Sequence, residues 1–152
     1  MYAASKCQRW TSRDVFIGRR RPRVLVVDDY EDAATAVAAY LQIEGAAVKT
    51  ANGCFDALHV VEKWSPDIIL LDIMMPEHDG FFTARALRRL SRDDFAIIAY
   101  TATDQDFVRL NSDASLFDGY CQKASSLTYL HRLIEGLVSR GHVSCLTFWN
   151  GR

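Results

Sequence analysis

An alternation of short apolar runs with amphipathic segments constrains the fold of this chain more than any other feature. It repeats five times between residues 23 and 140. Three of the runs, at residues 23–27, 67–72 and 95–100, are rich in Val, Ile or Leu, which is typical of buried strands. The segments between them place apolar residues at helical spacing. Because parallel strands need crossover connections, the alternation predicts a doubly wound α/β fold, with a five-stranded parallel sheet and helices on both faces.

The boundaries of the predicted elements follow from turn and capping residues. The expected strands cover residues 23–27, 46–50, 67–72, 95–100 and 118–121. The expected helices cover residues 33–44, 55–64, 81–91, part of 103–115, and a last segment that is capped by Ser125 or Ser126 and runs to about residue 140. The third apolar run is the most hydrophobic of the five, so we expect it at the centre of the sheet.

The charge of the chain is divided unevenly along its length. Residues 1–23 carry seven basic side chains and one acid, a charge of +6, whereas the remainder carries 11 basic and 18 acidic residues, a charge of −7. The net charge of −1 argues against a broadly basic nucleic-acid binder, and no apolar run approaches the roughly 20 residues of a membrane span. We therefore expect a flexible basic leader over residues 1–21, a folded domain over 22–141, and a short apolar tail over 142–152 that packs on the domain.

The four cysteines do not form a recognisable site. Cys7, Cys54, Cys121 and Cys145 are far apart, and no two have the spacing of a zinc site. Cys54 and Cys121 lie in patterned segments, where buried thiols are common. We expect a cytoplasmic chain with reduced cysteines.

Polar residues follow four of the five predicted strands. In doubly wound sheets the functional crevice lies at the carboxyl ends of the strands, and this rule selects five residues: Asp28, Asp29, Asp72, Thr101 and Lys123. Three carboxylates in one crevice repel one another unless a cation lies among them, and oxygen ligands favour Mg²⁺.

The same residues suggest a reaction. A cation, the Lys123 ammonium and the Thr101 hydroxyl around one carboxylate suit phosphoryl transfer to Asp72, which would attack as the nucleophile. Taken singly, each residue has an ordinary structural explanation, such as helix capping by an Asp pair or a solvated lysine. The prediction therefore depends on finding each one at the end of a separate strand, in order.

With these residues the chain resembles the receiver domain of two-component response regulators, of the single-domain, chemotaxis-regulator type. The resemblance covers residues 22–141 and implies a flavodoxin-like (βα)5 fold. The matching residues are the pair Asp28-Asp29, Asp72 within Leu70-Leu71-Asp72-Ile73-Met74-Met75-Pro76, Asp79-Gly80, Thr101-Ala102, and Tyr120 three residues before Lys123.

The resemblance implies a role for each matching residue. Asp72 would accept a phosphoryl group from a phosphohistidine. Asp29, Asp72 and the backbone carbonyl of Met74 would bind Mg²⁺ directly, and Asp28 would act through metal-bound water. Lys123 would contact Asp72 and then the phosphoryl group, Thr101 would bond a phosphoryl oxygen, and Tyr120 would change rotamer as Thr101 moves.

Two positions depart from the family pattern. Ala124 stands where the family usually has a proline, often after a cis peptide, and a non-proline cis bond costs about 3–4 kcal/mol. We therefore expect a trans bond and an altered loop after Lys123. Met74 and Thr103 occupy positions that tune loss of the phosphoryl group in receivers. Because Met74 cannot hydrogen-bond an attacking water, we expect slow hydrolysis.

The resemblance also implies partners. These are a sensor histidine kinase or histidine phosphotransfer protein, an unknown downstream protein, and a possible second copy bound through the fourth helix, fifth strand and fifth helix. The eleven residues after Gly141 are too few for an output domain, so we expect a stand-alone receiver or part of a longer protein, and not an enzyme acting on an outside substrate.

Three alternatives stay open. The first is a receiver-like interaction module that needs no phosphorylation. The second is a flavodoxin-like cofactor binder, although the acidic residues 28–32 would repel a phosphate. The third is an aspartyl-phosphate hydrolase, which the absence of a second acid two residues after Asp72 argues against.

Overall fold

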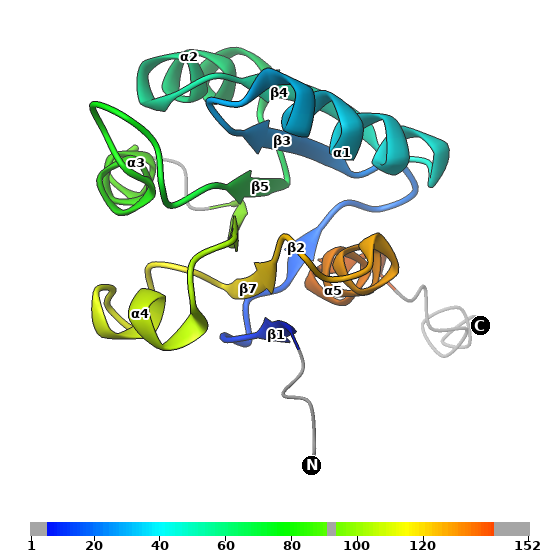
Figure 1. Ribbon diagram of the computed structural model, residues 1–152. Helices are drawn as coiled ribbons and strands as arrows, with labels where there is room; N and C mark the ends of the chain where they lie inside the picture. Colours follow the sequence, from blue (N-terminus) through cyan, green and yellow to red (C-terminus); the bar gives the residue numbers. More distant parts are fainter. Residues whose placement is uncertain (1–5, 91–93, 142–152) are drawn as a thin grey trace, which may run out of the picture.

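A six-stranded sheet forms the centre of the computed structural model, which describes residues 6–90 and 94–141 (Figure 1). The strands lie in the order β1-β7-β6-β5-β3-β4, and all neighbours except β1 and β7 are parallel. The parallel strands are β3 (Arg23–Val27), β4 (Ala47–Ala51), β5 (Ile68–Leu71), β6 (Ala96–Thr101) and β7 (Gly119–Gln122). This part of the sheet confirms the predicted doubly wound topology.

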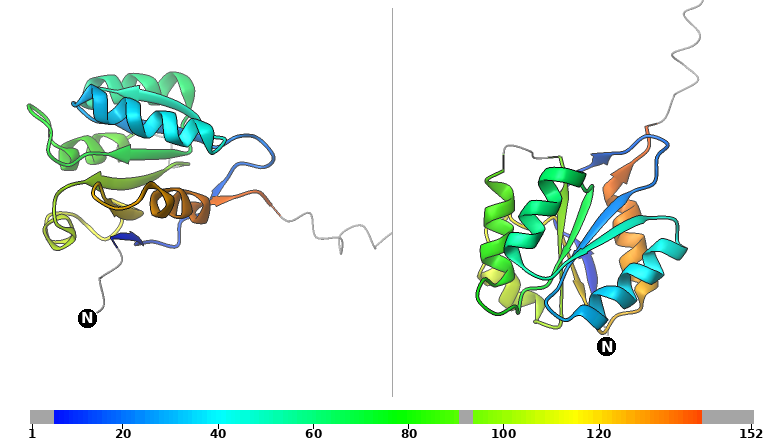
Figure 2. Two further views of the ribbon diagram at one scale, coloured as in Figure 1. Left: turned by 45° about the vertical axis from the view of Figure 1, so that its right-hand side comes forward. Right: turned by 90° about the horizontal axis from the view of Figure 1, so that it is seen from above.

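Helices cover both faces of the sheet, as predicted (Figure 2). One face packs against α1 (Glu31–Ile43) and α5 (Leu127–Leu137), and the other against α2 (Cys54–Trp64), α3 (Gly80–Arg88) and α4 (Gln105–Leu110). Alternate residues of each strand enter the two cores, so that Leu70 faces one and Ile69 the other. Strand β5 is fully buried at the centre of the sheet, as its hydrophobicity indicates.

Residues 6–21 do not form the flexible leader that we expected. Strand β1 (Cys7–Arg9) adds to the sheet as a sixth, antiparallel strand beside β7, and β2 (Val15–Phe16) pairs with β8 (Val138–Ser139) beyond α5. Val15 and Ile17 are buried in the core shared by α1 and α5. Backbone pairing with β7 and the burial of Val15 and Ile17 therefore account for the order of a segment whose sequence lacks strand-like alternation.

A buried acid holds the end of this segment in place. Asp67, just before β5, accepts hydrogen bonds from the Arg20 guanidinium at 2.7 Å and from the Arg23 backbone N–H at 2.8 Å. Arg20 is thus part of the folded domain rather than a solvated leader.

Three other expectations need correction or lie outside the described residues. The third and fifth helices end earlier than expected, at Arg88 and Leu137, whereas the fourth lies within the range expected for it. Cys7 and Cys121 form a disulfide, so the expectation of reduced cysteines is wrong for this pair, whereas Cys54 is a buried free thiol as expected. The tail, residues 142–152, lies outside the described residues. Within the described part of the chain, no helix is long and apolar enough to cross a membrane.

Candidate functional site

The candidate site lies where the strand order reverses. Strand β3 lies between β4 and β5. After β3 the chain continues to β4 on one side, whereas after β5 it continues to β6 on the other side. Asp28 follows β3 and Asp72 follows β5, so the register of the two strands places both carboxylates at one crevice.

Three carboxylates meet in this crevice, as the sequence predicted. Oxygens of Asp28, Asp29 and Asp72 all lie within 4.8 Å of one another. Asp28 and Asp72 are buried, whereas Asp29 is exposed. A cleft of about 290 Å³ opens beside them, and Asp28, Asp29, Glu31 and Asp56 supply its acidic lining.

Lys123 is the cation that faces these acids. Its Nζ donates to Asp28 Oδ2 at 2.6 Å and to Asp72 Oδ2 at 3.0 Å. Burial disfavours the ammonium form, but the hydrogen bonds to the two carboxylates outweigh this and raise the pKa of Lys123. The contact with Asp72 agrees with the role that the resemblance implied, and the equally close contact with Asp28 adds a second partner.

Thr101 and Tyr120 lie on neighbouring strands beside the crevice. The Thr101 side chain is fully buried, and its Oγ1 lies 3.1 Å from Thr103 Oγ1 and accepts the Thr103 backbone N–H at 3.2 Å. The Tyr120 hydroxyl donates to the Thr103 carbonyl at 2.6 Å, and its side chain is buried. Burial raises the pKa of Tyr120, and the nearby Asp104 charge raises it further. Thr101 and Tyr120 thus both contact Thr103, which links the two residues that we expected to move together.

The loop after Asp72 has one position that excludes a side chain. Gly80 donates its backbone N–H to the Ile73 carbonyl at 2.8 Å, which closes the loop onto the first turn of α3. A Cβ at Gly80 would lie 2.4 Å from the Asp72 carbonyl oxygen. Asp79 caps the helix by accepting the Phe82 N–H at 2.9 Å. The Asp79-Gly80 pair therefore sets the backbone that carries Asp72.

The two departures from the family pattern lie at the rim of the crevice. The described residues contain no cis peptide, so the Lys123–Ala124 bond is trans, as expected. The Ser125 N–H bonds the Gln122 carbonyl at 2.9 Å and closes a turn around Lys123. Met74 is 67% exposed, and its backbone N–H lies 3.4 Å from Asp72 Oδ1. A side chain at position 74 therefore stands in solvent next to the Asp72 carboxylate.

The charges of the crevice do not balance. Three carboxylates face one ammonium, which leaves a formal charge of −2 among groups that are partly shielded from water. Such an excess favours a bound cation, and a set of carboxylate oxygens fits a hard divalent ion such as Mg²⁺. Asp28 and Asp72 both lie beside the Lys123 ammonium, so the crevice brings carboxylates that can act as nucleophiles together with a positive charge that can attract an anionic group.

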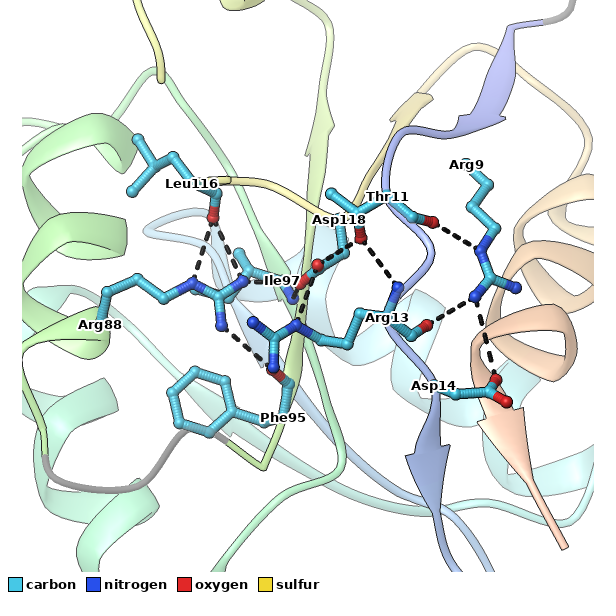
Figure 3. A network of polar contacts seen from close by, with 9 residues as sticks. All are labelled: Arg9, Thr11, Arg13, Asp14, Arg88, Phe95, Ile97, Leu116 and Asp118. Carbon is cyan, nitrogen blue, oxygen red and sulfur yellow. Dashed lines mark hydrogen bonds and ion pairs between the residues drawn. The ribbon is translucent and has the colours of Figure 1, made fainter. Parts of the chain in front are cut away.

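A second cluster of charges, at the opposite end of the strands, was not predicted as a site (Figure 3). Asp118, which is 1% exposed, accepts bonds at Oδ1 from Thr11 at 2.6 Å and Arg13 at 3.0 Å. Its Oδ2 accepts bonds from Arg88 at 2.6 Å and the Ile97 N–H at 2.9 Å. We call Thr11, Arg13, Arg88 and Asp118 the amino-edge network. Arg88 was expected on a solvated helix face. Its ion pair with Asp118 was not predicted because the two residues are 30 positions apart in the sequence.

Comparison with known proteins agrees with this geometry. A family model described as the response regulator receiver domain matches residues 24–135. Response regulator MprA of Mycobacterium leprae is 34% identical over 118 residues, covering 78% of this chain and 51% of the relative. The transcriptional regulatory protein PhoP of Bacillus subtilis is 30% identical over 122 residues, covering 80% and 50%. The chain thus spans about half the length of these curated relatives.

Solved structures of similar proteins share the fold. The chemotaxis protein CheY4 of Vibrio cholerae matches with a TM-score of 0.72 and 27% identity, covering 77% of this chain and 98% of that one. The response regulator TrrA of Thermotoga maritima, solved in complex with Mg²⁺ and BeF, matches with a TM-score of 0.67 and 30% identity, covering 76% and 98%.

Proposed function

Since the chain belongs to the response regulator receiver domain family, we propose that it accepts a phosphoryl group on Asp72, with Mg²⁺ bound at the adjoining carboxylates, and thereby switches a partner-binding surface. The observation that carries this proposal is the placement of Asp72 between an excess of carboxylates and Lys123. A phosphoryl group in transfer is stabilised by positive charge on both sides. In the crevice Lys123 supplies one positive charge, and the carboxylate oxygens can hold a metal ion that supplies the other.

Mg²⁺ would be held by Asp29 and Asp72, with the Met74 backbone carbonyl as a further ligand and Asp28 acting through water. When bound, it neutralises charge on the phosphoryl oxygens. The donor set supports this assignment because it consists of carboxylate oxygens within 4.8 Å of one another.

The protein's own groups perform the remaining steps. The Asp72 carboxylate attacks phosphorus and its Oδ atom forms the new P–O bond, while the phosphohistidine nitrogen leaves with the bonding electrons. Lys123 keeps its proton because its pKa is raised, so its ammonium can move from Asp72 to the phosphoryl oxygens. The Thr101 hydroxyl gives up its hydrogen bond to the Thr103 hydroxyl and bonds a phosphoryl oxygen instead. Because the Tyr120 hydroxyl bonds the Thr103 carbonyl, this movement alters the hydrogen bonding of Tyr120.

Partners follow from this chemistry. The phosphoryl donor would be a sensor histidine kinase or a histidine phosphotransfer protein, in the cytoplasm, where ATP supplies the phosphoryl group. The phosphorylated surface around α4, β7 and α5 would bind a downstream protein or a second copy of the chain. The protein promotes its own phosphorylation and turns over no outside substrate.

Intact-mass spectrometry after incubation with acetyl phosphate tests the proposal. We expect one phosphate on the wild-type protein in Mg²⁺, and none in excess EDTA. Asp72→Asn should carry none under either condition. Asp106→Asn is a matched control, because it removes an exposed carboxylate from α4 and should behave as wild type.

An adduct that persists in Asp72→Asn would refute Asp72 as the acceptor. A folded wild-type protein without any adduct in Mg²⁺ would instead favour the alternative, an interaction module that works without phosphorylation.

A further inference from the structure

We propose that the Cys7–Cys121 disulfide is a reversible redox bond that locks residues 6–13, which we call the clasp, over the edge of β7 between α4 and α5. The oxidised clasp covers a surface that the reduced protein exposes. This inference goes beyond the proposed function, because it concerns the clasp and requires no phosphorylation.

The strand register places the two cysteines for direct bonding. Cys7 pairs with Cys121, and backbone hydrogen bonds join Gln122 N–H to Lys6 O and Trp10 N–H to Asp118 O on either side. Hydrogen-bonded and non-hydrogen-bonded pairs alternate along antiparallel strands, so Cys7 and Cys121 form a non-hydrogen-bonded pair. Side chains approach most closely in such pairs, which explains why this register brings the two sulfurs together.

The clasp contacts both neighbouring helices and β7. The Trp10 ring stacks on the Tyr120 ring, with centroids 5.7 Å apart, and the Arg109 guanidinium from α4 lies 4.2 Å from the Trp10 centroid. Gln8 bonds Gln105 of α4 at 2.8 Å, and Arg9 bonds a carbonyl of α5. The occupant of the β7 edge is therefore the N-terminal segment of the same chain.

The amino-edge network anchors one end of the clasp independently of the disulfide. Thr11 and Arg13 bond buried Asp118 at the start of β7, whereas Cys7 lies near the end of the same strand. When the disulfide opens, this anchor keeps Cys7 at a high effective concentration near Cys121. Re-formation of the bond is therefore intramolecular, which makes the pair suited to repeated opening and closing.

One feature of Trp10 disfavours docking of the clasp when the disulfide is absent. Within the described part of the chain, the indole N–H of Trp10 is buried and has no acceptor. A buried, unpaired donor opposes docking. We infer that the covalent bond is needed to hold residues 6–10 on β7, and that they separate from it after reduction.

The redox step uses thiols as the reductant and a small disulfide as the oxidant. Cys7 is partly exposed and Cys121 is fully buried, so a thiolate such as that of glutathione attacks the Cys7 sulfur and Cys121 leaves as a thiolate that takes up a proton. A second glutathione releases Cys7. In sum, one protein disulfide and two thiols give two protein thiols and one glutathione disulfide, and oxidation reverses the reaction.

Alkylation in glutathione buffers of graded redox ratio tests the bond itself. The chain has four cysteines, so the denatured, alkylated protein should carry two labels when oxidised and four when reduced, and the change should reverse. Cys7→Ser should carry three labels at every ratio. Cys54→Ala, which lacks the buried free thiol, should lose one label and keep the transition. Four labels at every ratio, or a disulfide between two chains, would overturn the proposal.

Hydrogen exchange tests the release of the clasp. Reduction, like Cys7→Ser, should speed exchange at the Trp10 and Gln122 amides by roughly tenfold or more, because opening no longer works against a cross-link. The β5 amides should not change, which shows that the domain stays folded. Unchanged protection at Trp10 and Gln122 in both samples would refute the lock. Neither measurement uses acetyl phosphate, so failure here is separate from failure of the proposed function.

Discussion

The two ends of the sheet each hold buried carboxylates beside basic side chains, but they balance charge differently. In the amino-edge network, the Asp118 carboxylate faces two guanidiniums, and each of its oxygens accepts two hydrogen bonds. At the carboxyl edge, three carboxylates face a single ammonium, Lys123.

The difference separates a structural cluster from one that suits the proposed reaction. Asp118 is saturated with donors, so it has no free lone pair to offer a ligand, and its bonds join α3, β6 and the clasp. The carboxyl-edge acids keep an excess of negative charge beside a cleft, and that excess provides a reason to bind a cation and an electrophile. The two clusters therefore differ in the sign of their net charge, +1 at Asp118 and −2 at the carboxyl edge, and in whether their carboxylate oxygens are already saturated, rather than in burial.

The largest effect should come from breaking the saturated cluster. Asp118→Ala leaves the Arg88 guanidinium, whose side chain is 15% exposed, without its carboxylate. We expect the free energy of unfolding to fall by about 3–5 kcal/mol, as for other buried pairs that lose one partner. Urea denaturation measures this. Asp113→Ala, which removes an exposed acid from the same region, should change stability by less than about 0.5 kcal/mol. Equal effects of the two changes would contradict the structural role of Asp118.

The next effect concerns the unbalanced cluster. Mg²⁺ at about 100 times its Kd should raise the free energy of unfolding of the wild type by about 2.7 kcal/mol. Asp29→Asn should lose most of this increase, because it removes a carboxylate from the set of three. Denaturation with and without Mg²⁺ measures the difference, and Asp118→Ala should retain the full increase. If Asp29→Asn kept it too, the cation would bind elsewhere.

A smaller effect is expected on the lifetime of the phosphorylated state. Met74→Asn puts an amide beside Asp72, where it can orient an attacking water. One such hydrogen bond in the transition state is worth about 1.4 kcal/mol, or roughly a tenfold faster loss of phosphate. The decay of the phosphorylated mass after removal of acetyl phosphate measures the rate. Met74→Leu is the control without an amide, and equal rates for the two variants would refute the role of position 74.

The smallest effect is on alkaline stability. The raised pKa of Lys123 means that the folded state holds this proton more tightly than the unfolded state does. The contribution is therefore complete below the usual lysine pKa, near 10.4, and is lost as pH rises through the folded value. Burial raises the pKa of Tyr100 and Tyr120, which gives the same sign. The free energy of unfolding should therefore be measured against pH for the wild type and Lys123→Gln. Above pH 10.4 it should fall less steeply in the variant than in the wild type. Parallel curves would contradict the ion pair.

The sequence predicted the parts of the fold and site that depend on local pattern. Three strands of the parallel sheet, β3, β5 and β6, are largely apolar runs. The rule that parallel strands end at one edge was then enough to bring Asp28, Asp72 and Lys123 together. The trans bond before Ala124 followed from the same kind of reasoning, since a non-proline cis bond is costly.

The parts that were missed depend on contacts between distant residues. Cys7 and Cys121 are 114 residues apart, and the short segment around Cys7 has no alternating pattern, because its strand forms only by pairing with β7. Arg88 and Arg85 look alike on a helical projection, but only Arg88 reaches Asp118 in the described structure. No local signal distinguishes such pairs, because their partners are set by the packing of the whole domain.

The most direct test of the account locates the phosphoryl group. Tandem mass spectrometry of the wild-type protein, after incubation with acetyl phosphate and Mg²⁺, should place the group on Asp72 alone. A phosphoryl group on Asp118, or on several carboxylates with equal yield in EDTA, would contradict the claim that the unbalanced, cation-dependent charge at the carboxyl edge creates the reactive site.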